Sequence, residues 1–218
     1  MSYSCLEELQ VDLDLHALDK TSVLSNVGCK YNDGWLVVTD DGICYLFDKD
    51  DNPDDIRKIK YLKEKHIRKD ITKIVIPDSV RYIKDYTFMY NNKLMSVTIP
   101  NSVIDVGRGA FFSCHNLTNV TIGNCVKSIG KYAFFDCSSL MSMTIPNSVK
   151  SIRDYVFHSC KNLMSMTIPD SVTSIGYQAF YYCDKLANLI FKGKTLKQIK
   201  DMKDYPWGIE DESIVSIG

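Results

Sequence analysis

The feature that most constrains this chain is a motif that returns every 23 residues and never slips by a residue. It reads Ile-Pro-Asp-Ser-Val at residues 76–80, and further copies follow at the same spacing up to residues 168–172. A constant period of this length is typical of a solenoid, in which each repeat covers the hydrophobic core of its neighbours. We therefore expect a stack of about five to six rungs, where a rung is one 23-residue repeat.

One rung shows how the repeat encodes a short strand and a turn. Val97 and Ile99 are apolar and should point into the core. Ser96 and Thr98 alternate with them, which is the period-two pattern of a strand with one buried face. Pro100 has no amide hydrogen for a sheet, so the strand should end there. Apolar spacings of three and four after the turn predict a short helical or 3₁₀ return.

Eight cysteines raise the alternatives of disulfides, a redox role or a zinc site. Side chains at the same position of successive rungs stack in parallel about 5 Å apart, and parallel Cα–Cβ directions do not allow an unstrained disulfide. The chain has no close C-x₂-C pair of the kind that zinc sites use. We expect four of the cysteines to be buried thiols in one core column: Cys114, Cys137, Cys160 and Cys183.

The full repeat, L-x-x-[VM]-T-I-P-[DN]-S-V-x-x-I-x-x-x-A-F-x-x-C-x-x-L, closely resembles the BspA-like leucine-rich-repeat family. The resemblance covers residues 71–191, with departures at Asn91, Gly123 and Arg153. It implies a parallel-stranded solenoid used for adhesion or protein binding, often at a microbial cell surface. The predicted fold is therefore an α/β, β-dominated leucine-rich-repeat solenoid of about five to six rungs, with a parallel sheet on one face.

The residues before the repeats predict a separate unit. Residues 1–53 should form a small, acidic, β-rich domain with a strand at residues 9–15 and a hairpin at residues 35–47, where Asp-Gly supplies the turn. Residues 54–70 predict a helix. It is expected to cap the first rung of the solenoid at residues 71–191, and an independent basic helix that docks elsewhere is the alternative.

The end of the chain breaks the repeat and predicts a cap over residues 192–218. Thr195 should begin a short helix, and a last strand near residues 213–217 should close the final rung. Tryptophan-containing tails of this kind end many BspA-like arrays, so the resemblance also implies a cap here. Atypical terminal repeats are expected in any solenoid because they face solvent on one side.

Charge and hydropathy set limits on partners and location. A net charge of −1 argues against a nucleic-acid binder. Residues 71–191 nevertheless hold 11 basic and 7 acidic side chains, so either an ordinary solvated surface or a basic face on the repeats remains open. No signal peptide and no membrane span is recognisable. The sequence thus predicts an intracellular or particle-associated protein unless a leader was removed, whereas the family resemblance suggests the cell surface.

No constellation for catalysis or for a cofactor stands out. The four histidines include no H-E-x-x-H pair, and Gly193-Lys194-Thr195 lacks the earlier glycine of a phosphate-binding loop. The repeated serines of the turns have no base beside them in the sequence. We expect a protein that is not an enzyme and that holds no metal or cofactor.

The outward columns of the strands are the candidate binding surface, with central residues preferred because they lie far from both caps. Water ordering, a plain solvated sheet face and binding of a protein or glycan are the competing interpretations. The favoured function is a non-enzymatic interaction or adhesion module. One alternative is a structural subunit of a larger assembly such as a virus or phage particle, with the N-terminal domain as anchor. The other alternative is an enzyme with an unrecognised N-terminal site. The columns are Ser96, Asn119, Ser142, Ser165, Asn188 and Thr98, Thr121, Thr144, Thr167, Ile190, and the candidate site comprises all of them except Ile190.

Overall fold

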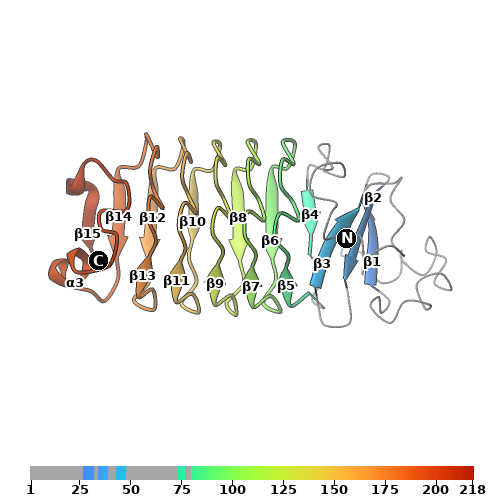
Figure 1. Cartoon of the computed structure of the whole chain (residues 1–218), viewed down its shortest axis with the longest axis horizontal. Coiled ribbons are helices and arrows are strands. Elements are labelled where there is room, and N and C mark those ends of the chain that lie inside the picture. The colour runs from blue at the N-terminus through green and yellow to red at the C-terminus, as the bar shows by residue number, and fades with distance from the viewer. Residues whose placement is uncertain (1–26, 32–33, 39–42, 48–72, 77–79) are drawn as a thin grey trace.

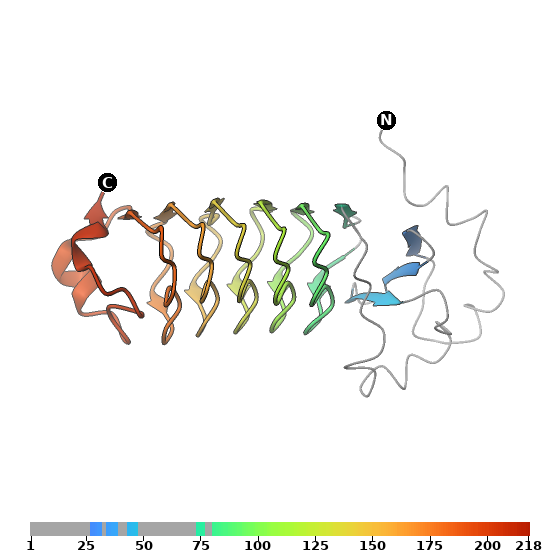
Figure 2. The same ribbon diagram turned by 90° about the horizontal axis from the view of Figure 1, so that it is seen from above.

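The computed structural model describes residues 27–31, 34–38, 43–47, 73–76 and 80–218. These residues form a β-solenoid whose rungs stand side by side along the long axis of the molecule (Figure 1). Seen from above, each rung is a loop with one strand on each of two opposite sides (Figure 2). The predicted fold class is confirmed.

One side carries the longer strands that the alternating pattern predicts. They pair in parallel with a 23-residue offset, so that identical repeat positions are neighbours. They form two sheets, β4-β6-β8 and β10-β12-β14-β15. The strands are β4 (Lys73–Val75), β6 (Ser96–Ile99), β8 (Asn119–Ile122), β10 (Ser142–Thr144), β12 (Ser165–Ile168), β14 (Asn188–Phe191) and β15 (Val215–Ile217).

The other side carries a second parallel sheet in place of the helical returns that the spacing predicts. Each return contains a two-residue strand whose backbone pairs with the rungs before and after it. Two residues per rung in the left-handed region, such as Tyr132 at φ 62° and Asp136 at φ 55°, turn the chain where a helix would continue. The strands are β5 (Tyr82–Ile83), β7 (Asp105–Val106), β9 (Ser128–Ile129), β11 (Ser151–Ile152) and β13 (Ser174–Ile175).

An N-terminal hairpin extends this second sheet. The predicted hairpin is confirmed as β2 (Gly34–Val38) and β3 (Ile43–Phe47), and β1 (Val27–Tyr31) is a further strand that the sequence reading missed. β3 pairs in parallel with β5, so the hairpin continues the sheet of the solenoid. The predicted strand at residues 9–15 and helix at residues 54–70 lie outside the described residues.

The core is built from columns that run along the solenoid axis. The five phenylalanines of one column stack ring on ring, with centroid separations of 5.2 to 5.9 Å. The expected cysteine column is found beside it: each thiol donates to the carbonyl of the phenylalanine one rung earlier, as Cys137 Sγ does to Phe111 O at 3.2 Å. Burial raises the pKa of Cys114 to about 12, so this thiol stays protonated.

The C-terminal cap follows the sequence prediction. Thr195 begins α3 (Leu196–Lys200) through a capping box with Gln198, and Ile199 is the buried residue of that helix. The 3₁₀ turn η2 (Glu212–Ile214) then leads into β15, which pairs with β14. Trp207 is fully buried and lies 5.5 Å from the ring of Phe191, so it closes the end of the phenylalanine core.

One step between rungs differs from the others, and we call it the wide step. It separates the rung of β8 and β9 from the rung of β10 and β11, and the longer strands do not pair across it. Phe134 and Phe157, on its two sides, have the largest separation of the stack, 5.9 Å. The hydrogen bond from Arg153 N to Ile129 O measures 3.4 Å, against 2.8–2.9 Å where glycine occupies the same position.

Candidate functional site

The long-strand face consists of the outward side chains on β6, β8, β10, β12 and β14, and it contains all the predicted site residues. Thr98, Thr121, Thr144 and Thr167 are exposed, while Val97 and the other inward neighbours are buried. The parallel register places Ser142 beside Ser165 and Thr144 beside Thr167. Every outward side chain named in the two predicted columns is uncharged. The face is thus a regular, neutral array of hydroxyl and amide groups.

The wide step divides this face into two groups. Ser96, Asn119, Thr98 and Thr121 are aligned within the sheet of β4, β6 and β8. The residues from β10 onward are aligned within the other sheet, which also includes Asn188. The sequence, which repeats evenly, gives no sign of this division. A partner that needs unbroken register would therefore meet the array on one side of the wide step.

A column of methionines borders the face, and the sequence reading overlooked it. Met95, Met141 and Met164 precede their strands and are exposed by 55%, 49% and 49%. The 23- and 46-residue spacings in the sequence were a sufficient signal to find them. Methionine is flexible and polarizable, and exposed methionines are typical of surfaces that adapt to a partner. The long-strand face therefore combines a rigid polar array with an adaptable apolar edge.

A band of partly exposed aromatic rings lies on the turns after the short strands. Phe112, Phe135 and His158 stack in sequence, with ring centroids 4.7 Å apart in both steps. Tyr132 stacks on Tyr155 at 5.0 Å. Partial burial lowers the pKa of His158, because the charged imidazolium is less well solvated there. The stacked rings cover one another's faces, whereas Tyr177 and Tyr182 at the end of the band are exposed by 51% and 53% and meet their neighbours edge to face.

Cations fill the gaps between tyrosines in the same band. Gly109 leaves no ring between Tyr86 and Tyr132, and a side chain there would collide with the Tyr86 ring. The Arg108 guanidinium lies 5.8 Å from the Tyr86 centroid and 5.5 Å from the Tyr132 centroid, which places it between the two rings. Lys131 likewise approaches the Tyr132 ring at 5.3 Å. The arrangement stabilises the stack and holds these cations in place.

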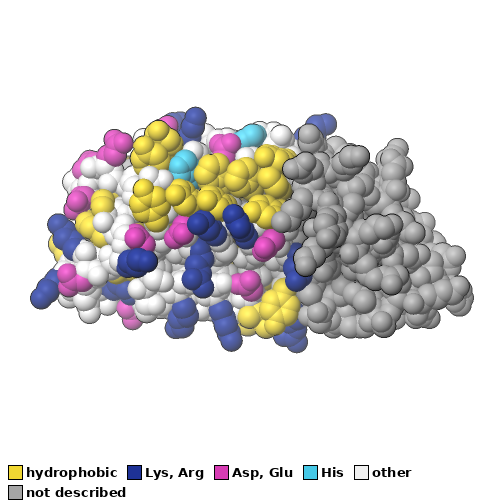
Figure 3. Space-filling view, in the orientation of Figure 1, with side chains coloured by type: hydrophobic (Ala, Val, Ile, Leu, Met, Phe, Trp, Pro, Cys, Tyr) yellow, Lys and Arg dark blue, Asp and Glu magenta, His cyan; other side chains and the backbone are white. Residues whose placement is uncertain are grey.

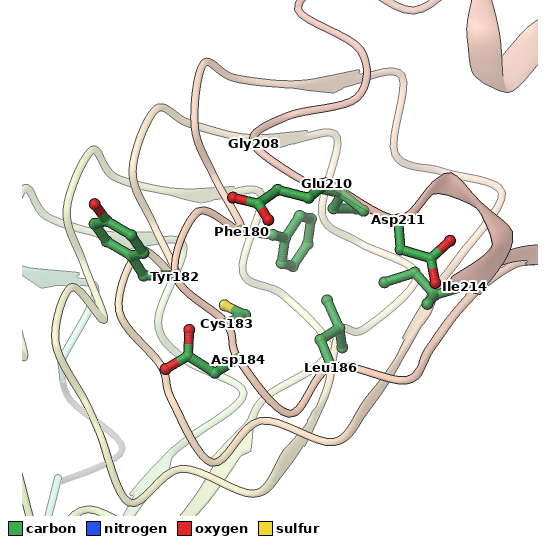
Figure 4. Close-up of a pocket in the computed structure, with 10 residues that line it drawn as sticks. Phe180, Tyr182, Cys183, Asp184, Leu186, Gly208, Glu210, Asp211 and Ile214 are labelled. Atoms are coloured by element: carbon green, nitrogen blue, oxygen red, sulfur yellow. The ribbon is translucent and has the colours of Figure 1, made fainter.

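A small cavity of about 230 Å³ lies between the last rung and the C-terminal cap. Figure 4 shows Phe180, Cys183 and Leu186 from the rung, with Glu210 and Asp211 contributed by the cap. Cys183 and Leu186 are half-buried here, although the same columns are fully buried in earlier rungs, because the cap takes a different path. The volume is below the range of about 300–1,000 Å³ typical of small-molecule sites.

The described residues offer little chemistry for metal binding or catalysis. No group of three or more histidine, cysteine or acidic side chains among them is placed to hold a metal ion. His115 Nε2 lies 2.8 Å from Asp136 Oδ2 on the surface. The hydroxyls of Ser102, Ser148 and Ser171 are buried in the turns rather than presented to a substrate. In the part of the chain that the structure describes, no helix has the length and apolar character needed to cross a membrane.

Comparison with known proteins identifies one family and several solved structures of similar fold. The family described as BspA type leucine rich repeat region matches residues 65–187 in six copies, which agrees with the predicted repeat region. No curated protein matches the chain. The family match therefore rests on the repeats themselves rather than on a characterised relative.

Solved structures from several bacteria are similar to this chain. A leucine-rich cell surface protein from Faecalibacterium prausnitzii is 24% identical with a TM-score of 0.65, over 84% of this chain and 45% of that protein. The leucine-rich repeat protein of T. pallidum is 21% identical with a TM-score of 0.60, over 87% and 80%. A leucine-rich repeat protein from Bacteroides ovatus is 27% identical with a TM-score of 0.52, over 68% and 42%. This chain thus spans less than half of the Faecalibacterium protein.

Proposed function

Because the chain belongs to the BspA-type leucine-rich-repeat family, we propose that it is a non-enzymatic interaction or adhesion module that binds a protein on its long-strand face. The observation that carries this proposal is the exposed methionine column beside the aligned serines and threonines. The array is fixed in register by the sheet, so a partner meets several groups that need no further ordering. Such pre-organisation lowers the entropic cost of binding.

The composition of the long-strand face favours a protein over a charged ligand. Its predicted site residues carry no charge, so they offer no ion pair to an anionic or cationic polymer. The exposed methionines, by contrast, supply the apolar contact area that protein interfaces bury at their centres. Binding is expected to centre on Ser142, Thr144, Ser165 and Thr167, which lie together in one sheet.

The test is a double substitution, Thr144→Lys with Thr167→Lys. Both side chains are exposed, so the variant should unfold at the same temperature as the wild type while two ammonium groups block the face. The matched control, Asn124→Lys with Asn147→Lys, adds the same charge on exposed turns of two neighbouring rungs. Affinity capture from source material, followed by mass spectrometry, should identify a protein that the wild type and the control retain and the face variant loses.

Loss of the same protein by the control variant would contradict the proposal, since added charge alone would then explain it. Undiminished capture by a folded face variant, together with loss of capture on changes within residues 1–70, would favour the alternative. In that case the solenoid is a spacer in a larger assembly and the N-terminal part is its anchor. Location at a cell surface stays a prediction from the family.

A further inference from the structure

The second sheet gives the solenoid a face that differs in charge from the first. We call it the short-strand face: the exposed residues on and beside β5 to β13. Arg81, Lys127, Lys150 and Arg153 are exposed there. None of these four forms an ion pair within the described residues, whereas Lys131 is paired with Asp154 at 3.2 Å. Figure 3 shows lysine and arginine side chains gathered over β7, β9 and β11, below a band of hydrophobic side chains.

The backbone holds two of these cations in consecutive rungs. Lys127 N donates to Ile104 O at 2.8 Å, Lys150 N donates to Lys127 O at 3.0 Å, and Thr173 N donates to Lys150 O at 2.9 Å. Lys127 and Lys150 are therefore neighbours at the rung spacing of about 4.8 Å. Like charges at directly opposed positions of a sheet repel one another, and no described carboxylate relieves this pair. An external anion would relieve the repulsion.

A strip of small residues runs beside the two lysines. Asp105, Ser128, Ser151 and Ser174 form one row of it, in which the Ser128 hydroxyl donates to the Asp105 carboxylate, and Gly130 and Gly176 lie in the next row but one. Glycine is needed there because a Cβ at Gly130 would lie 2.7 Å from the backbone of the rung before. The strip is consequently shallow along the solenoid axis except at Arg153, which takes the glycine position in its rung. Arg108 and Lys131 lie on its far side, where Lys131 is paired with Asp154.

From this arrangement we infer that the short-strand face binds an acidic polysaccharide laid along the solenoid axis. Lys127 and Lys150 border the strip on one side and Arg108 and Lys131 on the other, and the two cations of each pair are one rung apart, which is close to the length of one pyranose unit. A chain with one carboxylate or sulfate on each sugar would present anions at nearly the same interval. The Ser151 and Ser174 hydroxyls of the strip supply hydrogen bonds to sugar hydroxyls, whereas the Ser128 hydroxyl donates to Asp105.

The stacking of the aromatic rings favours a polysaccharide over a single-stranded nucleic acid. Proteins that bind such strands combine a basic groove with aromatic faces on which bases stack. The central rings beside this face are stacked on each other, at 4.7 Å between Phe112 and Phe135, and so offer edges, while the exposed Tyr177 and Tyr182 lie at the C-terminal end of the band. The overall charge of −1 does not oppose the inference, because it averages an acidic N-terminal stretch with this basic face.

The experiment compares dextran sulfate with neutral dextran of the same length, using the full chain. Binding to dextran sulfate should weaken by roughly tenfold or more between about 50 and 200 mM salt, and neutral dextran should not bind. The triple variant Lys127→Gln, Lys150→Gln, Arg153→Gln should bind at least about tenfold more weakly at low salt and show a shallower salt dependence. All three side chains are exposed, so its thermal midpoint should not change by much.

A matched triple variant distinguishes the effect of losing cations from the short-strand face from the effect of lowering the net charge. Lys93→Gln, Lys161→Gln and Lys192→Gln remove the same charge from exposed positions outside the face, and this control should bind like the wild type. Equal weakening by both triple variants would overturn the inference, as would binding of neutral dextran. Tighter binding of polyuridylate than of dextran sulfate would also overturn it, in favour of a nucleic acid. The Thr144→Lys, Thr167→Lys variant should keep dextran sulfate binding, so this test is independent of the protein partner.

Discussion

The wide step and the step before it join rungs of nearly the same sequence, yet they differ in geometry. Across the earlier step, Gly130 N reaches Val106 O at 2.8 Å and the phenylalanine rings are 5.3 Å apart. Across the wide step, Arg153 N reaches Ile129 O at 3.4 Å and the rings are 5.9 Å apart. The sheet of longer strands is interrupted at the same step. Two sequence differences coincide with it: Arg153 adds a Cβ at a position where backbones meet closely, and Pro146 lacks the amide that Gly123 donates to Ile99 O at 2.8 Å across the earlier step.

The comparison shows which contacts of the repeat tolerate a change in spacing. The hydrogen bond from a cysteine thiol to the rung before has the same length across both steps. Cys160 Sγ lies 3.2 Å from Phe134 O across the wide step, and Cys137 Sγ lies 3.2 Å from Phe111 O across the earlier step. The separation therefore opens between the longer strands and at Arg153, whereas the cysteine column and the backbone bond from Lys150 N to Lys127 O, 3.0 Å, keep their spacing. A solenoid is stabilised by nearest-neighbour interfaces, so a weak step lowers the coupling between the two halves of the array.

The largest expected effect is a loss of stability at alkaline pH, shared by all steps. Burial raises the pKa of Cys114 and Cys183 to about 12 and that of Cys137 and Cys160 well above 9.0. The unfolded thiols lose their protons from about pH 9 upward while the folded thiols keep them, so the free energy of unfolding falls as pH rises. At pH 10 each thiol should lower the free energy of unfolding by about 1.4 kcal/mol, or about 6 kcal/mol for four.

Denaturant titrations at pH 8 and pH 10 measure this loss, and cysteine-to-alanine variants isolate it from other groups. Cys137→Ala and Cys160→Ala should each reduce the difference between the two pH values by about 1.4 kcal/mol. Equal reductions would show that the wide step does not change the contribution of the buried thiols to stability. A drop that is the same with and without these cysteines would contradict the assignment to buried thiols.

The next effect concerns the phenylalanine stack, at a ring away from the wide step and at a ring that borders it. Phe111→Ala and Phe134→Ala each remove a fully buried ring, which should lower the free energy of unfolding by about 3–5 kcal/mol. Phe134 borders the wide step, so we expect its loss to fall at the lower end of this range. Phe135→Ala, in the partly exposed aromatic band, is the matched neighbour and should cost about 1 kcal/mol. Urea denaturation of the three variants gives the order, and a larger loss for Phe135→Ala would contradict this account of the core.

Much of the fold was readable because its signals are local and repeated. The alternation in Ser96–Ile99, the Asp-Gly pair in the sequence before β3 and the capping box at Thr195 each specify an element within a few residues. The second sheet was missed because two-residue strands such as β9 are too short to show a period. They form because neighbouring rungs supply the pairing, which is information from tertiary structure rather than from local sequence.

The candidate site was predictable in part. The outward threonines follow directly from the alternation, and the structure places them on one side of the solenoid. Met141 and Arg153 were visible at fixed repeat positions, yet their significance depends on exposure and on the approach of two backbones. The division of the face at the wide step could not be foreseen, because a departure from glycine at residue 153 does not by itself reveal how close the next rung lies.

The smallest effect tests the origin of the wide step itself. Gly130→Ala places a Cβ 2.7 Å from Gly107 C and 2.8 Å from Val106 O, so the two rungs must move apart. Overpacking of this kind should cost about 1–3 kcal/mol, measured by urea denaturation, and hydrogen exchange at Gly130 and its neighbours should speed up. Arg153→Gly is the reverse substitution and should slow exchange across the wide step, although the added backbone freedom of glycine offsets part of the gain. If Gly130→Ala is neutral and Arg153→Gly leaves exchange unchanged, the Cβ at residue 153 is not what separates these rungs.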